Sequence, residues 1–268
     1  MSGPVRVEAE VVAQWFAAPG YCRLRLRAPS RMGARPGQFI HVLPRGLSSH
    51  DPLLRRAFSV LSVSDTEIEI LYRVQGRGTT LMSLWRTGDV ADLLGPLGNG
   101  FPPLPEPPLR AILVGGGVGV PPMAMLASTR HNLQDVTALI GARSKADVLC
   151  RSDFELHGVK IRVATDDGSS GHHGLVTDLL REELKVRPAA VFSCGPWPML
   201  RAVAKICAEF DAPCQVSLEE AMPCGIGICN GCVVAVRDGG SDYGRYRRVC
   251  VEGPVMDSRE IDWDGEVA

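Results

Sequence analysis

Four cysteines toward the C-terminal end have the spacing of a metal-cluster site. Cys224, Cys229 and Cys232 stand in the stretch CGIGICNGC, and seventeen residues separate the last of them from Cys250. The pattern C-x4-C-x2-C…C is typical of chains that hold a 2Fe–2S cluster through four thiolates. Glycines inside the loop allow backbone N–H groups to approach the sulfur atoms. The spacing therefore predicts a 2Fe–2S cluster on these four cysteines.

Other uses of the cysteines are weaker alternatives. A four-cysteine zinc site usually brings two C-x2-C pairs, and this chain has one. Nine cysteines among 268 residues are too few for a disulfide scaffold in a chain long enough to bury a core. Zinc and unreactive thiols remain the rival interpretations.

Two arginine-bearing segments could bind phosphate. Arg56 lies in RRAFSV, residues 55–60, and Arg73 ends the strand-like segment LYR. The following VQGRGTT leads through glycines into a helix-like run that begins near Thr79, where N–H groups and the helix dipole favour an anion. Each element alone is also typical of an ordinary strand or helix start, but together they could hold a pyrophosphate.

A glycine-rich turn indicates a nucleotide site. Residues 111–123, AILVGGGVGVPPM, read as strand, turn and helix at the carboxyl edge of a parallel sheet. The pattern is not G-x-G-x-x-G, so a tight packing turn is the alternative. FSCGPW brings Cys194 to the same edge, and TDDGSSGHHG supplies Asp166, which could accept ribose hydroxyls or cap a turn. We expect His172 and His173 in that loop to be solvated, without a carboxylate partner.

Hydrophobic periodicity predicts an α/β multidomain fold. Residues 5–12, 23–27 and 66–71 alternate apolar and polar side chains between Gly- and Pro-containing turns, as in an antiparallel barrel or sandwich. Proline-rich residues 102–108 suggest a linker. From residue 110, apolar strand-like runs alternate with helix-like runs, which predicts a parallel sheet.

Composition excludes some classes of partner. The chain is 45% hydrophobic and 22% charged, with a formal net charge of −1, so we expect neither nucleic-acid nor membrane-surface binding. Its apolar runs are broken by glycine and proline, which argues against a membrane span. The first residues lack the basic and apolar segments of a secretion signal, and we expect a reducing, cytoplasmic location.

The chain resembles the electron-transfer subunits of heteromeric, NAD-linked dihydroorotate dehydrogenase, within the ferredoxin-reductase superfamily. The segments that carry the resemblance are, in order, RRAFS, LYR, GRGT, GGGVGVPPM, TDDGSSGHHG, CGPWPML, SLEEAMPCGIGICNGC and VCVEGPV. The cysteine-bearing stretch is the most specific of them. The resemblance implies an FAD-binding β-barrel domain at 1–105, an NAD-binding α/β domain at 106–216 and a small 2Fe–2S domain at 217–268.

The resemblance also implies roles for individual residues. The FAD ligands would be Arg56 at the phosphates, Ala57, Phe58 and Ser59 along the ring system, Leu71, Tyr72 and Arg73 along the ring and chain, and Gly78 and Thr79 at the pyrophosphate. The nicotinamide nucleotide would contact Gly115, Gly116, Gly117, Gly119, Asp166, Cys194, Gly195 and Pro196. This chain departs from the family where Ala57 replaces a usual proline and where Asn230–Gly231 replaces a frequent aromatic residue or alanine.

The inferred cofactors imply a function. A nicotinamide exchanges a hydride, a cluster passes single electrons, and a flavin can do both. By resemblance, the partner is an FMN-containing dihydroorotate dehydrogenase catalytic subunit in a heterotetramer of pyrimidine biosynthesis, docked through an apolar surface near the cluster. Electrons would pass through the cluster and FAD to NAD, which the charges of Asp166 and Asp167 favour over NADP. We expect no catalytic acid or base. The alternatives are a free-standing NAD(P)H reductase feeding another oxidoreductase or oxygenase, and a redox sensor.

Overall fold

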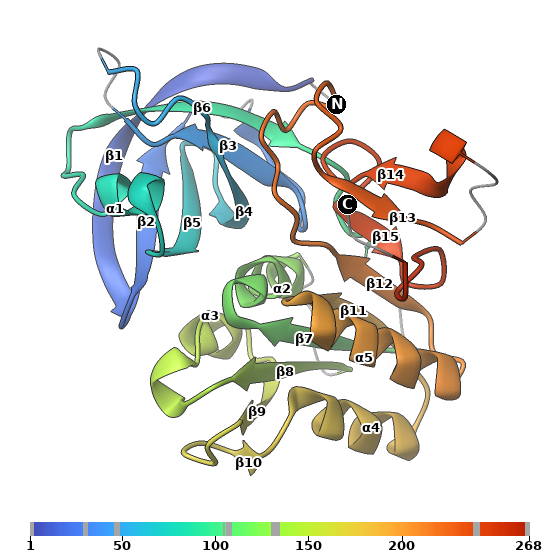
Figure 1. Ribbon diagram of the computed structural model, residues 1–268. Helices are drawn as coiled ribbons and strands as arrows, with labels where there is room; N and C mark the ends of the chain where they lie inside the picture. Colours follow the sequence, from blue (N-terminus) through green and yellow to red (C-terminus); the bar gives the residue numbers. More distant parts are fainter. Residues whose placement is uncertain are drawn as a thin grey trace.

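The structure is a computed structural model that describes residues 3–28, 32–45, 49–103, 105, 109–129, 135–237 and 242–265. It contains an antiparallel barrel, an α/β layer structure and a C-terminal segment that carries the four cysteines and lies against both (Figure 1). The predicted fold class is confirmed. Part of the predicted linker, residues 104 and 106–108, lies outside the described residues.

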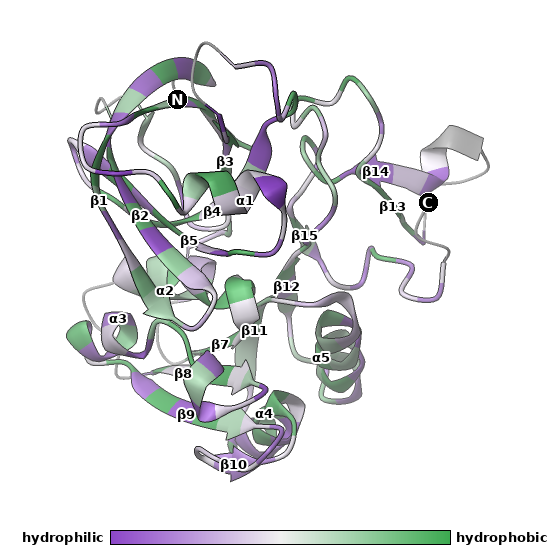
Figure 2. Ribbon diagram, turned by 60° about the vertical axis from the view of Figure 1, so that its left-hand side comes forward, coloured by the Kyte–Doolittle hydropathy of each residue, from purple (hydrophilic) through white to green (hydrophobic). Residues whose placement is uncertain are grey.

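Six strands form the closed barrel in the order β1-β2-β5-β4-β3-β6. Alternation explains the barrel, because leucines on β2 are fully buried while the arginines between them face outward. Figure 2 shows the same alternation as bands along β1 and β2. The elements are β1 (Val5–Ala18), β2 (Tyr21–Arg27), β3 (Phe39–Leu43), β4 (Arg56–Val63), β5 (Glu67–Arg73), the helix α1 (Arg77–Met82) and β6 (Val90–Leu97).

The second region is a seven-stranded sheet in the order β10-β9-β8-β7-β11-β12-β15, parallel except for the last pair. Its central strands are continuous apolar runs because helices cover them. The strands are β7 (Arg110–Gly116), β8 (Val136–Ala142), β9 (Lys160–Thr165), β10 (His172–His173), β11 (Ala189–Cys194), β12 (Cys214–Ser217) and β15 (Val255–Asp257). The helices are α2 (Val120–Ser128), α3 (Arg151–Leu156), α4 (Val176–Val186) and α5 (Trp197–Glu209).

The histidine pair corrects one expectation. His172 and His173 form β10, a two-residue edge strand parallel to β9, and do not lie in an irregular loop. His172 also has a carboxylate neighbour, because its Nε2 lies 3.4 Å from Oδ2 of Asp178 at the start of α4. His173 is exposed, as expected of a solvated residue.

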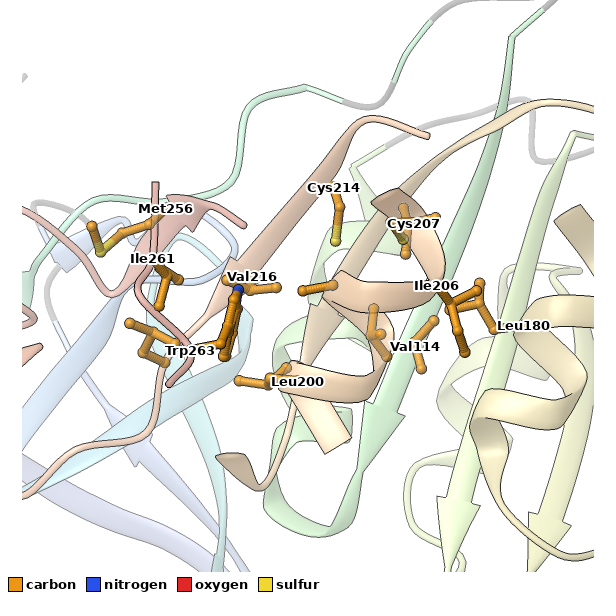
Figure 3. Close-up of a cluster of buried hydrophobic side chains, with 14 of the residues drawn as sticks. Val114, Leu180, Leu200, Ile206, Cys207, Cys214, Val216, Met256, Ile261 and Trp263 are labelled. Atoms are coloured by element: carbon orange, nitrogen blue, oxygen red, sulfur yellow. The ribbon is translucent and has the colours of Figure 1, made fainter. Parts of the chain in front are cut away.

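The C-terminal segment is anchored on the α/β region. A small sheet of β13 (Val233–Ala235) and β14 (Tyr246–Arg248) follows the cysteine loop, and β15 then pairs antiparallel with β12. Figure 3 shows Met256, Ile261 and Trp263 of this segment packed with Leu200 of α5 and neighbouring core side chains. The rings of Trp197 and Trp263 are 4.8 Å apart. This core fixes the cysteine loop relative to the sheet.

Contacts between the regions also hold the barrel in place. Arg23 of β2 binds Asp153 of α3 through an ion pair of 2.9 Å, and Met125 of α2 joins the barrel core. On the other side, the N–H group of Asn99 donates to the carbonyl of Gly253 at 2.6 Å. In the part of the chain that the structure describes, no helix is long and apolar enough to cross a membrane.

Candidate functional site

A cavity of about 1090 Å³ lies where the barrel, the carboxyl edge of the parallel sheet and the start of the cysteine segment meet. Its walls come from β4, β5, the turn after β7, the ends of β8 and β11, and residues 217–223. Ligands of open α/β sheets bind at this edge. The volume is at the upper end of the range for ligand pockets, so there is room for cofactor-sized ligands.

The barrel wall contains most of the residues predicted for FAD. Those that line the cavity are Arg56, Ala57, Phe58, Ser59, Leu71, Tyr72, Arg73 and Thr79. The rings of Phe58 and Tyr72 are 5.5 Å apart and tilted, and Tyr72 donates its hydroxyl to Gln14 at 3.3 Å. This wall therefore combines an aromatic pair with two arginines, Arg56 and Arg73, which suits a ring system that carries phosphates.

Gly78 does not line the cavity but shapes it. A Cβ atom at this position would lie 3.2 Å from Pro44 and 3.3 Å from the Nε atom of Arg56, so glycine allows α1 to approach the arginine. The Thr79 hydroxyl accepts hydrogen bonds from the N–H groups of Gln75 and Gly76, at 3.0 and 3.2 Å, which caps the helix start. Arg56 and the helix start thus lie together, as the sequence predicts.

The glycine turn after β7 serves two purposes. Gly116 and Gly117 line the cavity, as do Asp166, Cys194 and Pro196. The neighbouring Gly115, Gly119 and Gly195 do not line it. A Cβ atom at Gly119 would lie 2.2 Å from the carbonyl oxygen of Cys194, so this glycine is required for close packing of the turn against β11. The sequence left two alternatives for this turn, a nucleotide site and a tight packing turn. In the structure, some of its glycines line the cavity and others allow close packing against β11.

Several lining residues were not predicted from the sequence. Arg143 and Asp147 follow β8 at the same sheet edge, so the rule that placed Asp166 could have found them. Glu219 and Glu220 stand in the motif SLEE, which carries part of the resemblance, but the sequence interpretation assigned neither of them a role. Burial raises the pKa of Glu219 to about 7. Burial, and then the nearby charge of Glu219, raise the pKa of the Cys194 thiol well above its usual range.

The four predicted cluster cysteines follow residues 217–223 along the chain, and Cys250 lies beside Cys232. Cys232 and Cys250 are buried, Cys224 is half-buried, and Cys229 is exposed. The Gly231 N–H group donates to the Cys229 sulfur at 3.4 Å. Although burial opposes it, hydrogen bonds from the N–H groups of Ile226, Cys229 and Ile228 hold the pKa of Cys224 at about 6. Backbone donors directed at a thiolate are the environment that a metal-bound cysteine needs.

The four thiols lie in two pairs, Cys224 with Cys229 and Cys232 with Cys250, which suits a binuclear cluster. Burial raises the pKa of Cys250 to about 12, and a hydrogen bond with Cys232 adds to the shift, so these two thiols lie together. A zinc ion needs its ligands around one centre, whereas a 2Fe–2S cluster divides four thiolates between two iron atoms. The donor set therefore fits the cluster.

Comparison with known proteins gives the family. The electron transfer subunit of dihydroorotate dehydrogenase B (NAD(+)) from Desulforamulus reducens is 38% identical over 265 residues, which cover 96% of this chain and 98% of the relative. The chain belongs to this family. The subunit of the same name from Bacillus caldolyticus is 43% identical over 233 residues, covering 85% and 86%. Family membership confirms the predicted electron-transfer function of an oxidoreductase subunit.

Further matches agree with this dihydroorotate dehydrogenase B family. The model for its iron–sulfur cluster binding domain matches residues 219–262, which contain all four cysteines. The NADH-dependent reduced ferredoxin-NADP oxidoreductase, a flavin-based electron-bifurcating protein, aligns with a TM-score of 0.80 and 30% identity over 96% of this chain and 90% of its own. A ferredoxin NADP+ reductase from Neisseria gonorrhoeae with bound FAD and NADP shares the fold, with a TM-score of 0.64, 18% identity and coverage of 76% and 91%. The family-model match confirms an iron–sulfur cluster binding domain in this chain, and the likeness to the reductase confirms the fold.

Proposed function

We propose that the chain passes electrons from a dihydroorotate dehydrogenase catalytic subunit, by way of a 2Fe–2S cluster and FAD, to NAD. One observation carries the proposal: Pro223, the residue before Cys224, lines the same cavity as Ser59 of the barrel and Cys194 of the sheet edge. The cluster loop, the inferred flavin wall and the inferred nucleotide edge therefore border one space. FAD supplies the exchange between hydride and single-electron transfer when it is bound.

We assign the residues in and beside the cavity to the three cofactors as follows. Arg56, whose Nη1 atom donates to the Leu54 carbonyl at 2.8 Å, is held in place to bind the FAD phosphates. Phe58, Ser59, Leu71 and Tyr72 cover the ring system. Gly116, Gly117 and Pro196 receive the nicotinamide nucleotide, and Asp166 disfavours a 2′-phosphate by charge repulsion. Cys224, Cys229, Cys232 and Cys250 hold the cluster.

An apolar surface around the cluster loop supports a docked partner. Ile226, Ile228 and Val251 are exposed on this loop and beside it, with Ile228 exposed to 75%. A Cβ atom at Gly227 would lie 2.6 Å from Val251, so the surface is continuous across the loop. Exposed apolar side chains that cluster together mark interaction surfaces. We assign this surface to an FMN-containing catalytic subunit in a heterotetramer, which we place in the cytoplasm.

The three-domain division remains part of the proposal. The limit at residue 216 falls inside β12, and β15 returns to the same sheet. The 2Fe–2S region therefore shares a sheet with the nucleotide region, which keeps the cluster at a fixed position relative to the cavity.

Reconstitution with the catalytic subunit tests the function. The chain and the dihydroorotate dehydrogenase of its host, both loaded with cofactors, are mixed without oxygen, and dihydroorotate-dependent NADH formation is followed. We expect a stable complex and NADH. Ile228→Asp should weaken the complex, whereas the matched control Leu156→Asp, on α3 and exposed to 82%, should leave it intact. If loaded proteins form neither a complex nor NADH, the pyrimidine assignment is wrong, and a free-standing reductase becomes the better interpretation.

A further inference from the structure

His41 is a buried histidine with no hydrogen-bond partner. It lies on β3 and has no solvent exposure, and among the described residues both of its ring nitrogens lack a partner. Burial, and then the positive charge of Arg55, lower the pKa of His41 to about 4. The imidazole is therefore neutral and carries one N–H donor and one acceptor. A buried polar group without a partner is costly, so such a ring indicates a binding partner outside the protein chain.

The ring of His41 faces the cysteine loop. A Cβ atom at Gly225 would lie 2.4 Å from Cε1 and 2.5 Å from Nε2 of the imidazole, so only glycine permits this contact. Gly225 follows Cys224 directly and has a φ of +68°, which suits glycine. The Nε2 edge of the ring thus lies against the loop that carries the first three cysteines. Figure 1 shows the chain after β12 running up along the barrel.

His41 also belongs to the flavin side of the molecule. Its register partner on β4 is Ala57, which lines the cavity between Arg56 and Phe58. Its register partner on β6 is Leu94. The histidine therefore stands on the strand that separates the cluster loop from the inferred FAD wall.

The surroundings identify the missing acceptor. Phe39 presents a tilted ring at 5.6 Å, and Arg55 is a cation that offers no acceptor on its side chain. Sulfur atoms of an iron–sulfur cluster accept hydrogen bonds and are the acceptors that the adjacent loop would hold.

We propose that His41 donates its Nε2–H group to a sulfur atom of the cluster and so raises the cluster's reduction potential. The proposal rests on the cluster assigned to these cysteines. Reduction adds negative charge to the cluster, and a fixed donor stabilises that charge more in the reduced state than in the oxidised state. His41 is thus a positioning residue that tunes electron flow between the cluster and the flavin.

Pulsed EPR on the wild-type protein tests the contact without any substitution. The chain is produced with ¹⁵N-labelled histidine, purified without oxygen and reduced with dithionite. We expect a ¹⁵N coupling to the cluster, together with a proton coupling that exchanges in D₂O. The ¹⁵N coupling should disappear in His41→Gln and persist in His50→Leu, because His50 is an exposed histidine outside the loop. Absence of any ¹⁵N coupling in a protein with full cluster content overturns the proposal.

A redox titration tests the consequence. His41→Leu removes the donor, and we expect a tenfold loss in the equilibrium constant for one-electron reduction, which lowers the potential by about 59 mV. His41→Gln keeps an N–H donor and should recover most of that shift, whereas His50→Leu should match wild type. An unchanged potential in His41→Leu contradicts the proposal. If His41→Leu loses its cluster, the wild-type coupling decides the question. Wild-type protein without iron and sulfide would instead overturn the proposed function.

Discussion

The cysteine loop and the cavity are neighbouring sites that differ in how the chain builds them. The loop uses residues close together in the sequence, and the cavity uses residues far apart in it. Three of the four cysteines lie within residues 224–232, and the N–H groups of the same loop hold the Cys224 sulfur. The cavity instead takes its lining from positions between Tyr21 and Pro254, on both sides of the sheet edge. A local site depends on a few covalent neighbours and should fail completely when one is changed. A site assembled from distant strands should lose function in proportion to the contact removed.

The largest effect should come from the local site. Cys229→Ser removes one cluster ligand, and we expect loss of most iron and sulfide with FAD retained, because the cavity does not use this side chain. Metal and sulfide analysis of anaerobic protein, with an absorption spectrum for the flavin, measures both. Cys150→Ala, a buried cysteine outside the loop, is the control and should keep its iron. Zinc without sulfide in the wild-type protein would contradict the cluster.

The next effect concerns the glycine turn. Gly119→Ala places a Cβ atom 2.2 Å from the Cys194 carbonyl, so the turn must move away from β11. Overpacking of this kind typically costs about 1–3 kcal/mol. We expect flavin reduction by NADH to slow by about tenfold or more, because a displaced turn moves the nucleotide away from the position that hydride transfer needs. Gly3→Ala, where a Cβ atom meets open space away from the cavity, is the control in anaerobic stopped-flow measurements. Equal rates for all three proteins would show that the turn does not position the nucleotide.

A single contact in the distributed site should have a smaller effect. Arg56→Ala removes one charge-assisted phosphate contact, worth about 1.5–3 kcal/mol, so we expect FAD affinity to fall by at least about tenfold while the protein still folds. Arg27→Ala removes an exposed arginine paired with Glu10 on the barrel surface and should not change FAD affinity. Extensive dialysis followed by flavin quantification compares them. Retention equal to wild type in Arg56→Ala would remove this residue from the phosphate site.

The last effect is a pH-dependent one at Glu219, and it concerns the stability of the protein and not the loading of either site. Its pKa is raised by burial from 4.5 to about 7, so the folded state binds more protons than the unfolded state between these values, and stability falls as pH rises through this window. Glu219→Gln should remove this loss of unfolding free energy, which amounts to about 3 kcal/mol at pH 8 and is small at pH 4. Thermal unfolding at several pH values should show a gain in the variant that grows with pH. A gain independent of pH would contradict the buried carboxyl.

The sequence predicts these two sites unequally, for physical reasons. Spacing along the chain predicts the cysteine site, because a cluster loop wraps its ligand with consecutive residues. Alternation predicts the barrel, and continuous apolar runs predict the parallel sheet. The antiparallel pairing of β15 with β12 was not predicted, because a strand of three residues is too short to show an alternation of apolar and polar side chains.

The cavity was only partly predictable. Arg143 follows a strand of the parallel sheet and could have been found by the sheet-edge rule, whereas Glu219 reaches the cavity because tertiary topology brings the end of β12 to the same edge. His41 gave no signal at all, because a lone histidine in the buried strand FIHVL reads as a core residue. Only its contact with Gly225, distant in the sequence, shows what it faces.

The central claim is that one chain holds both a two-electron and a one-electron carrier. Anaerobic reductive titration of the purified protein tests it most directly, with absorption and EPR recorded together. We predict an uptake of about three electrons per chain, two at the flavin and one at the cluster, and about two in Cys229→Ser. An uptake of two electrons by wild-type protein with full flavin content, and no EPR signal from a reduced cluster, would contradict the account.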